Sequence, residues 1–333
     1  MELEKIAYAP YDGPEQFITE WTDRIWVERG IGLIRENYAA DAIVHGSSGT
    51  VRGAEPVVRS TLMKINAFPD RVGQAADVIW EPRGSDAFLS SHLVLSAGRH
   101  TGHTAYAAPT HREFSSYTIA TCLYRRGVME YEWVVRDEGA VVQQLGLDPY
   151  EVARRTAVSE WAAQAHEPLP RPVLEAGDTG PRPDLHRRYC ALVLELIEEV
   201  WNQRMLHRTG EYVARDVTGH LPRHRTVVRP DGYQRGLLEL LAPFPDARFE
   251  VRDIVAHDEP ARGGVRVGVV WWLRGTYGGT PVHGPVTGSP VTVLGSSQFR
   301  FRDGRVVEEW RVYDEIALLA QIARARGDEP TGD

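Results

Sequence analysis

The sequence predicts two tandem α+β domains, each a curved antiparallel sheet wrapped around a helix. Three observations lead to this fold class. The chain has 333 residues, more than the roughly 100–200 residues of a typical domain. Short segments recur in the same order in its two halves. Within each half, helical periodicity comes first and strand-like alternation follows, which is typical of α+β domains.

The internal repeat is clearest near the end of each half. EWVVRDE at 132–138 returns as EWRVYDE at 309–315, an offset of 177 (309 − 132). Two further pairs have offsets of 176 and 175: AFPD (67–70) with PFPD (243–246), and DAIVH (41–45) with DVTGH (216–220). Because the order is kept while the offset drifts by one or two residues, as loop insertions would produce, we infer a tandem duplication.

The repeat divides the chain into three parts. We expect a first domain at 1–147, a linker at 148–183 and a second domain at 184–333. The linker begins with the polar helical stretch EVARRTAVSEWAAQA. It continues with EPLPRPVLEAGDTGPRPD, whose prolines disfavour both helix and sheet.

Each copy contains the same predicted elements in the same order. An amphipathic helix through Trp21 or Leu196 is followed by a short segment around Asp-x-x-x-His. A second helix then ends near Pro69 or Pro245. The remaining segments alternate as strands do, at 74–82, 86–98, 111–124 and 127–137 in the first copy and at 247–257, 265–275, 289–301 and 304–314 in the second.

Composition narrows the functional classes. The formal net charge is −8, which disfavours binding to phosphate backbones or anionic lipid heads, so we expect neither a nucleic-acid nor a membrane partner. Only Cys122 and Cys190 are present, which excludes a disulfide framework and suits a reducing compartment. The N-terminal segment does not look like a secretory leader. We therefore expect a cytoplasmic protein.

The last predicted strand of each copy ends in an acid. Counting alternate side chains places Asp137 on the same face as Tyr131 and Trp133, and Asp314 on the same face as Trp310. A carboxylate at the edge of an apolar pocket is held closer to neutrality and can exchange protons. The alternative is that both aspartates are N-caps of the helices that follow, and the two roles are compatible.

A histidine recurs near the start of each copy, as His45 and His220. Histidine titrates near neutral pH and could share proton transfer with the aspartate of its own copy. The alternative is a histidine that hydrogen-bonds the backbone at a loop entrance.

The first copy has further histidines at 92, 100, 103 and 111. The HTGH segment resembles a metal motif, but on a strand His100 and His103 would point to opposite faces. We therefore expect no metal, and place these side chains at a pocket mouth or in solvent. In the second copy, His283 stands where the first has Tyr106.

These segments resemble a known family. YAADAIVHGSSGTVRGAEPVV, AFPD, GRHTGHTAYAAPTHREF and EWVVRDEGAVVQQLG are similar, in that order, to the SnoaL-like polyketide cyclase family of the nuclear transport factor 2-like superfamily. Weaker versions follow in the second copy: YVARDVTGHLP, PFPD, RGTYGGTPVHGPVTGSPV and EWRVYDEIALLAQI.

The resemblance implies a cone-shaped α+β barrel in each copy, with an internal pocket for a small, largely apolar molecule. Enzymes of this family use acid/base groups without metal or organic cofactor, as cyclases, dehydratases or isomerases. Single-unit members pair through their sheets, which implies a pseudo-dimer within this chain, and a homodimer of the chain is also considered. The residues expected to contact the substrate are Tyr131, Trp133, His92, His103 and Tyr106 in the first pocket, and Trp310 and His283 in the second.

Three functions remain open at this point. The leading one is an acid/base enzyme (lyase or isomerase) acting on a small carbonyl-bearing substrate, with Asp137 and His45 moving protons in the first pocket and Asp314 and His220 in the second. The second is a protein of the same fold that only binds a small molecule or supports an assembly. The third is a division of labour in which the first copy is active and the other is a scaffold.

Overall fold

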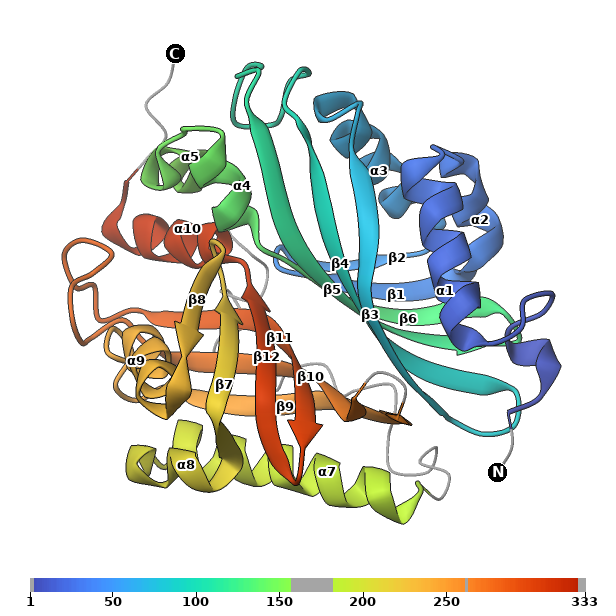
Figure 1. Cartoon of the computed structure of the whole chain (residues 1–333). Coiled ribbons are helices and arrows are strands. Elements are labelled where there is room, and N and C mark those ends of the chain that lie inside the picture. The colour runs from blue at the N-terminus through green and yellow to red at the C-terminus, as the bar shows by residue number, and fades with distance from the viewer. Residues whose placement is uncertain (1–2, 157–181, 261–262, 329–333) are drawn as a thin grey trace.

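A computed structural model describes residues 3–156, 182–260 and 263–328 of the chain (Figure 1). Most of the predicted linker at 148–183 lies outside these ranges. Its described beginning contains the short helix α5 (Pro149–Arg155), which packs against α10 (Glu315–Arg326). Among the described residues, no helix combines the length and the apolar character needed to cross a membrane.

The first domain contains a six-stranded sheet with the order β2-β1-β6-β5-β4-β3. Helix α1 and the π-helical turn η2 precede the sheet, and α3 lies between β2 and β3, where Gly53 adopts a left-handed backbone conformation (φ 75°) before the helix. The elements are α1 (Pro14–Thr22), η2 (Asp23–Val27), α2 (Ile34–Asn37), β1 (Tyr38–Gly46), β2 (Gly49–Arg52), α3 (Ala54–Ala67), β3 (Val72–Pro82), β4 (Ala87–Arg99), β5 (Glu113–Arg125), β6 (Val128–Arg136) and α4 (Glu138–Gln144).

The second domain repeats this arrangement, with the strand order β8-β7-β12-β11-β10-β9. This confirms the two tandem α+β units, and all eight predicted strand segments match observed strands to within two residues. The elements are α7 (Asp184–Glu195), η4 (Leu196–Asn202), α8 (Thr209–Tyr212), β7 (Val213–Leu221), β8 (Arg225–Val228), α9 (Arg229–Leu241), β9 (Arg248–Glu259), β10 (Gly264–Thr276), β11 (Pro290–Arg302), β12 (Arg305–Tyr313) and α10. Short 3-10 turns at Lys5–Ala7, Ile31–Leu33 and Leu206–Arg208 complete the two domains.

The expectation of a purely antiparallel sheet is wrong. β1 pairs with β6 in parallel, and β7 pairs with β12 in parallel. Antiparallel neighbours can be joined by a tight hairpin, whereas parallel neighbours need a long crossover. Here α3 and four strands separate β1 from β6 along the chain, so the pairing direction is not visible in any local sequence pattern.

Each sheet has two differently covered faces. Figure 1 shows α1, α2 and α3 on one side of the first sheet and the second domain on its other side. We call the side covered by a domain's own helices the inner face and the opposite side the outer face. The two outer faces pack against each other through a core shared by both domains, which includes Leu93, Trp133, Val135, Val270, Trp272 and Val312.

The contact between the outer faces is tight and includes hydrogen bonds from one domain to the other. The Trp133 indole, which has no exposed surface, donates a hydrogen bond of 2.7 Å to the Asp253 carboxylate of the second domain. The Gln298 side chain donates to the carbonyl oxygen and hydroxyl of Ser91, at 2.9 and 3.0 Å. Burial of each large apolar side chain here contributes about 1.5–3 kcal/mol. The pseudo-dimer within one chain is therefore a continuous core.

Ser91 and Gly268 occupy equivalent positions of the two domains (268 − 91 = 177) and meet at this contact, where a Cβ added to Gly268 would lie 2.6 Å from the Ser91 Cβ. We predict that Gly268→Ser lowers the free energy of unfolding by about 1–3 kcal/mol, because two side chains would occupy the space of one. Adding Ser91→Gly should restore most of this loss, as measured by urea unfolding.

Gly210→Ser is the matched control, because a Cβ added there meets no atom within 4 Å. A Gly268→Ser variant as stable as the wild type would contradict the tight contact.

Candidate functional site

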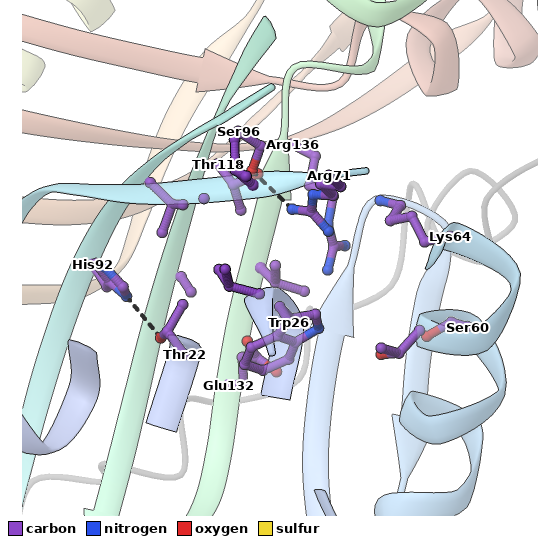
Figure 2. Close-up of a pocket in the computed structure, with 17 residues that line it drawn as sticks. Thr22, Trp26, Ser60, Lys64, Arg71, His92, Ser96, Thr118, Glu132 and Arg136 are labelled. Atoms are coloured by element: carbon purple, nitrogen blue, oxygen red, sulfur yellow. Dashed lines mark hydrogen bonds between the residues drawn. The ribbon is translucent and has the colours of Figure 1, made fainter. Parts of the chain in front are cut away.

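The first domain contains a cavity of about 130 Å³ on the inner face of its sheet. One water molecule needs roughly 10–15 Å³ in this measure, so the space exceeds a packing defect. Its walls come from α1, η2, α3 and strands β3 to β6 (Figure 2). Trp26, Val94 and Val134 form its apolar wall. Its polar side chains include Glu132 and His92.

Glu132 is the buried acid of this cavity. It lies on β6 with 7% of its surface exposed, and the Tyr38 hydroxyl donates to its Oε2 at 3.1 Å. Burial raises the pKa of Glu132, while the nearby Arg136 opposes this rise. A carboxyl group whose pKa is moved toward neutrality is suited to exchange protons with a substrate.

The equivalent acid of the second domain has a different environment. Glu309 (309 − 132 = 177) forms a two-point ion pair with Arg311, with both N–O distances at 2.9 Å. In the first domain the position of Arg311 is taken by Val134 (311 − 134 = 177). Glu132 therefore faces the cavity without the arginine that neutralises its counterpart.

His92 lines the same cavity from β4. It is buried, its Nδ1 lies 3.5 Å from the Thr22 hydroxyl, and its Nε2 has no hydrogen-bond partner. Burial lowers the pKa of His92 to about 4, so the imidazole is neutral at pH 7. A buried ring nitrogen without a partner is available to a bound molecule.

Three cations gather at one end of the cavity. Figure 2 shows Lys64 projecting from α3 toward Arg71 and Arg136. Lys64 pairs with Glu138 at 3.1 Å, and Arg71 donates to the Ser96 hydroxyl at 2.8 Å. This end of the cavity is therefore positively charged.

The inner face of the second domain is filled by its own side chains. Trp271 stands at the position of Val94, and its indole donates to the Ser297 hydroxyl at 3.2 Å. Gly295, at the position of Thr118, makes room for this ring, because a Cβ added to Gly295 would lie 2.1 Å from it. Trp271 belongs to a fully packed aromatic core with Trp201 and Phe249. In the second domain the Trp271 ring thus occupies the space that corresponds to the cavity beside Val94 and Thr118.

A second hollow, of about 490 Å³, lies between α9 and α10 at the rim of the second domain. His283, predicted to contact a substrate, is among its lining residues, together with Phe244 and Tyr313. Its two arginines are already paired, Arg223 with Glu315 and Arg225 with Glu239. This hollow therefore offers mostly apolar surface and neutralised charge.

Asp137 lies away from the first cavity and against the second domain. Its Oδ1 accepts the Ala140 N–H at 2.9 Å, which caps α4, and its Oδ2 accepts the Arg223 N–H at 2.6 Å. Burial raises the pKa of Asp137 to about 6, and these two hydrogen bonds oppose the rise. The capping alternative is thus realised, with an interdomain bond added to it.

Asp314 has the matching position in the second domain. Its Oδ1 accepts the Ala317 N–H at 3.1 Å and caps α10, and the Ser47 side chain of the first domain is a further hydrogen-bond partner. Burial, followed by the charge of Glu138, raises the pKa of Asp314 to about 7. In each domain, the loop after the first strand thus hydrogen-bonds the capping aspartate of the other domain. Ser47 after β1 bonds Asp314, and Arg223 after β7 bonds Asp137.

The recurring histidines also lie on the outer faces. His45 stacks on Trp133 with ring centroids 4.2 Å apart and contacts the Thr50 hydroxyl at 2.7 Å. Burial, then the charges of Arg52 and Arg252, lower the pKa of His45 to about 4. His220 stacks on Trp310 at 4.9 Å and contacts Glu308 at 2.9 Å.

The face of β6 that we expected to line the pocket is the wrong one. Tyr131 and Trp133 belong to the core between the two domains, and Trp310 packs against that core. His103 is exposed on the loop after β4, and Tyr106 packs against the cluster formed by α4, α5 and α10. Of the predicted substrate-contacting residues of the first domain, the cavity contains His92 alone.

The cavity residues that sequence reasoning missed are Glu132, Lys64, Arg71 and Arg136. A signal for Glu132 was present, because it recurs as Glu309 in the repeat. We instead expected the pocket on the opposite face of β6, because that face is more apolar. That face is apolar because it is buried against a second domain, whereas an internal pocket retains polar groups.

Comparison with known proteins identifies the fold family of this arrangement. Residues 191–322, which span the second domain from α7 to α10, match the model of the SnoaL-like polyketide cyclase family. This segment belongs to the SnoaL-like family. The first domain repeats its strand order, so the chain carries two tandem SnoaL-like folds. No curated protein sequence matches the chain.

Solved structures similar to the chain correspond to one SnoaL-like unit. IdmH, a candidate polyketide cyclase from Streptomyces antibioticus, is 27% identical; the match covers 40% of this chain and 98% of IdmH, with a TM-score of 0.36. AclR, a candidate hydroxylase from Streptomyces galilaeus, is 25% identical, with coverages of 41% and 97% and a TM-score of 0.36. A SnoaL-like candidate polyketide cyclase from Jannaschia is 22% identical, with coverages of 43% and 97% and a TM-score of 0.39.

The interdomain position of Asp137 predicts a pH effect on stability. Because its pKa is about 6 in the folded SnoaL-like domain and about 3.9 in an unfolded chain, its contribution is fully present below pH 4 and is lost as the pH rises through 6. Relative to Asp137→Asn, the wild type should lose about 2–3 kcal/mol of unfolding free energy between pH 4 and 7, measured by urea titration at each pH.

Asp41→Asn, on the exposed part of β1, controls for the loss of one formal charge. A constant difference between the wild type and Asp137→Asn across this pH range would contradict the assignment.

Proposed function

We propose that the first domain is an acid/base enzyme that removes a proton next to a carbonyl group in a small, partly apolar substrate, as cyclases, dehydratases and isomerases do. The observation that carries this proposal is Glu132. It is a buried carboxyl group facing an open cavity, and its counterpart Glu309 is neutralised by Arg311 in a filled domain. The SnoaL-like fold of the chain is consistent with this class of chemistry.

In the proposed step, a Glu132 oxygen accepts the proton from the carbon next to the carbonyl. The electron pair of the broken C–H bond moves to the carbonyl oxygen and forms an enolate. The positive end of the cavity at Lys64, Arg71 and Arg136 stabilises this negative charge where it develops. The proton on Glu132 then returns to another atom of the substrate, which gives a shifted double bond or assists the departure of water.

Two further side chains support this chemistry. Tyr38 is a positioning residue, because its hydroxyl holds Oε2 of Glu132, and the Cys122 side chain is a further hydrogen-bond partner of this carboxyl group. Neutral His92 can donate or accept one hydrogen bond through its free ring nitrogen. Both groups orient the reacting atoms at the start of the step.

The proposal gives the second domain a structural role. Its inner face is filled, and its outer face completes the core on which the first sheet rests. Asp137, His45, Asp314 and His220 are therefore assigned to interdomain contacts and capping, with no proton transfer. Because the outer faces are covered within one chain, the proposed site needs no second copy. The cytoplasmic location stays a prediction from composition.

The base is tested by proton exchange, which needs no knowledge of the natural product. Wild-type protein is incubated in D2O with a panel of small ketones and oxo acids, and deuterium entry next to the carbonyl is followed by NMR. We expect Glu132→Gln to lower the exchange rate by about 10²–10⁴-fold, because the proton acceptor is removed. Glu308→Gln, in the second domain, is the control and should exchange at the wild-type rate. Equal rates in Glu132→Gln and wild type would refute the role of Glu132.

The cavity itself is tested by copying the filled domain into the open one. Val94→Trp with Thr118→Gly reproduces Trp271 over Gly295, so the ring should occupy the cavity while the domain stays folded. We expect exchange to be abolished and the thermal midpoint to be kept, measured by NMR and circular dichroism.

The reciprocal variant, Trp271→Val with Gly295→Thr, is the control. It opens the second inner face, where Glu309 is still paired with Arg311, and should leave the exchange rate unchanged while lowering stability. Full activity in the folded Val94→Trp, Thr118→Gly variant would place the reaction elsewhere.

A further inference from the structure

The cations of the first cavity exceed what its fold requires. Lys64 on α3, Arg71 just before β3 and Arg136 at the end of β6 meet at one end of the cavity (Figure 2). The equivalent positions in the second domain are Leu240 (240 − 64 = 176), Ala247 (247 − 71 = 176) and Tyr313 (313 − 136 = 177). Because the same strand order forms there with no charge at any of the three positions, these cations are not needed to build the domain.

Two of the three cations form no ion pair with a described residue, although the charge of Glu138 acts on both and that of Glu132 acts on Arg136. Glu138 neutralises Lys64 at 3.1 Å. Arg71 bonds only the Ser96 hydroxyl, and no described residue places a carboxylate within 4.0 Å of either Arg71 or Arg136. Glu132, whose pKa is raised, lies on the same strand as Arg136 but is bonded to Tyr38. Positive charge at this end is therefore only partly compensated.

Burial and mutual repulsion disfavour the charged forms of Lys64 and Arg71. Burial, then repulsion by Arg136, lower the pKa of Lys64 to about 8 and that of Arg71 to about 10. An anion bound between these groups would relieve the repulsion and restore their charge.

We propose that Arg71 and Arg136 form an anion subsite that holds a carboxylate of the substrate, which would then be a small oxo acid. Guanidinium groups present paired N–H donors that match the two oxygens of a carboxylate. Val94, Val134 and Trp26 would contact the short apolar body of the molecule, and its carbonyl would lie between the subsite and Glu132. This inference rests on the proposed function of the same cavity.

Equilibrium binding tests the subsite separately from turnover. The probes are 4-oxopentanoate and 3-phenylpropanoate, each compared with its methyl ester, so that the members of a pair differ in the negative charge and in one methyl group. Binding is followed by saturation-transfer NMR and by tryptophan fluorescence, since Trp26 lines the cavity. All measurements use the full chain, in wild type and in Glu132→Gln, where binding persists even if no proton exchange occurs.

We expect the wild type and Glu132→Gln to bind each acid about 10- to 100-fold more tightly than its ester. Arg136→Gln and Arg71→Gln should each remove most of this preference, and Lys64→Gln should reduce it less, because Lys64 is already paired. Arg300→Gln is the matched control. This arginine pairs with Glu308 in the second domain, and its variant should keep the wild-type preference.

Equal affinities of the wild type for acid and ester, or a full preference for the acid in Arg136→Gln, would overturn the subsite. A preference for the acid in a protein that catalyses no exchange would overturn the proposed reaction and leave the subsite in place. Exchange without any preference for the acid would do the reverse.

Discussion

The packing of the two outer faces is the contact on which the rest of the molecule depends. It buries Trp133 and Trp272 in one core, pairs the Trp133 indole with Asp253, and brings Ser91 against Gly268. Because the outer face of each sheet is covered by the other domain, most of its side chains can be apolar. Its inner face can then hold charged groups around a cavity without the domain losing its hydrophobic core.

The inner faces of the two domains carry different side chains at equivalent positions. The change from Val94 to Trp271 is matched by the change from Thr118 to Gly295, and the change from Val134 to Arg311 is matched by an ion pair with Glu309. Each large side chain that fills the second domain thus has a residue that accommodates it: Gly295 leaves room for Trp271, and Glu309 pairs with Arg311. Both domains have the same strand order, but only in the second does a tryptophan fill the space between helices and sheet at this position. The cavity of the first domain therefore depends on its side chains and not on its backbone fold.

The sequence predicts much of the fold and little of the site. Alternation of apolar and polar residues predicts every long strand, and comparison of the chain with itself predicts the repeat and the two α+β units. The parallel pairing of β1 with β6 depends on contacts across the whole domain and leaves no local trace. Asp137 and Trp133 share a face as alternation requires, but alternation cannot say what covers that face. An apolar face suggests a ligand pocket and a domain interface equally well, and here it is the interface, so Glu132 on the opposite face was overlooked.

Encoding both units in one polypeptide has a consequence for the symmetry of the assembly. In a pair of identical chains, a tryptophan that fills one cavity would fill both, and an arginine cluster in one would appear in both. The covalent tandem removes this restriction, since position 94 and position 271 are set by separate codons. The Arg223 N–H that bonds Asp137 belongs to the filled unit, so the unit whose inner face is filled holds in place the segment beside Glu138 and Lys64. Duplication thus allows one half to specialise while the other supports it.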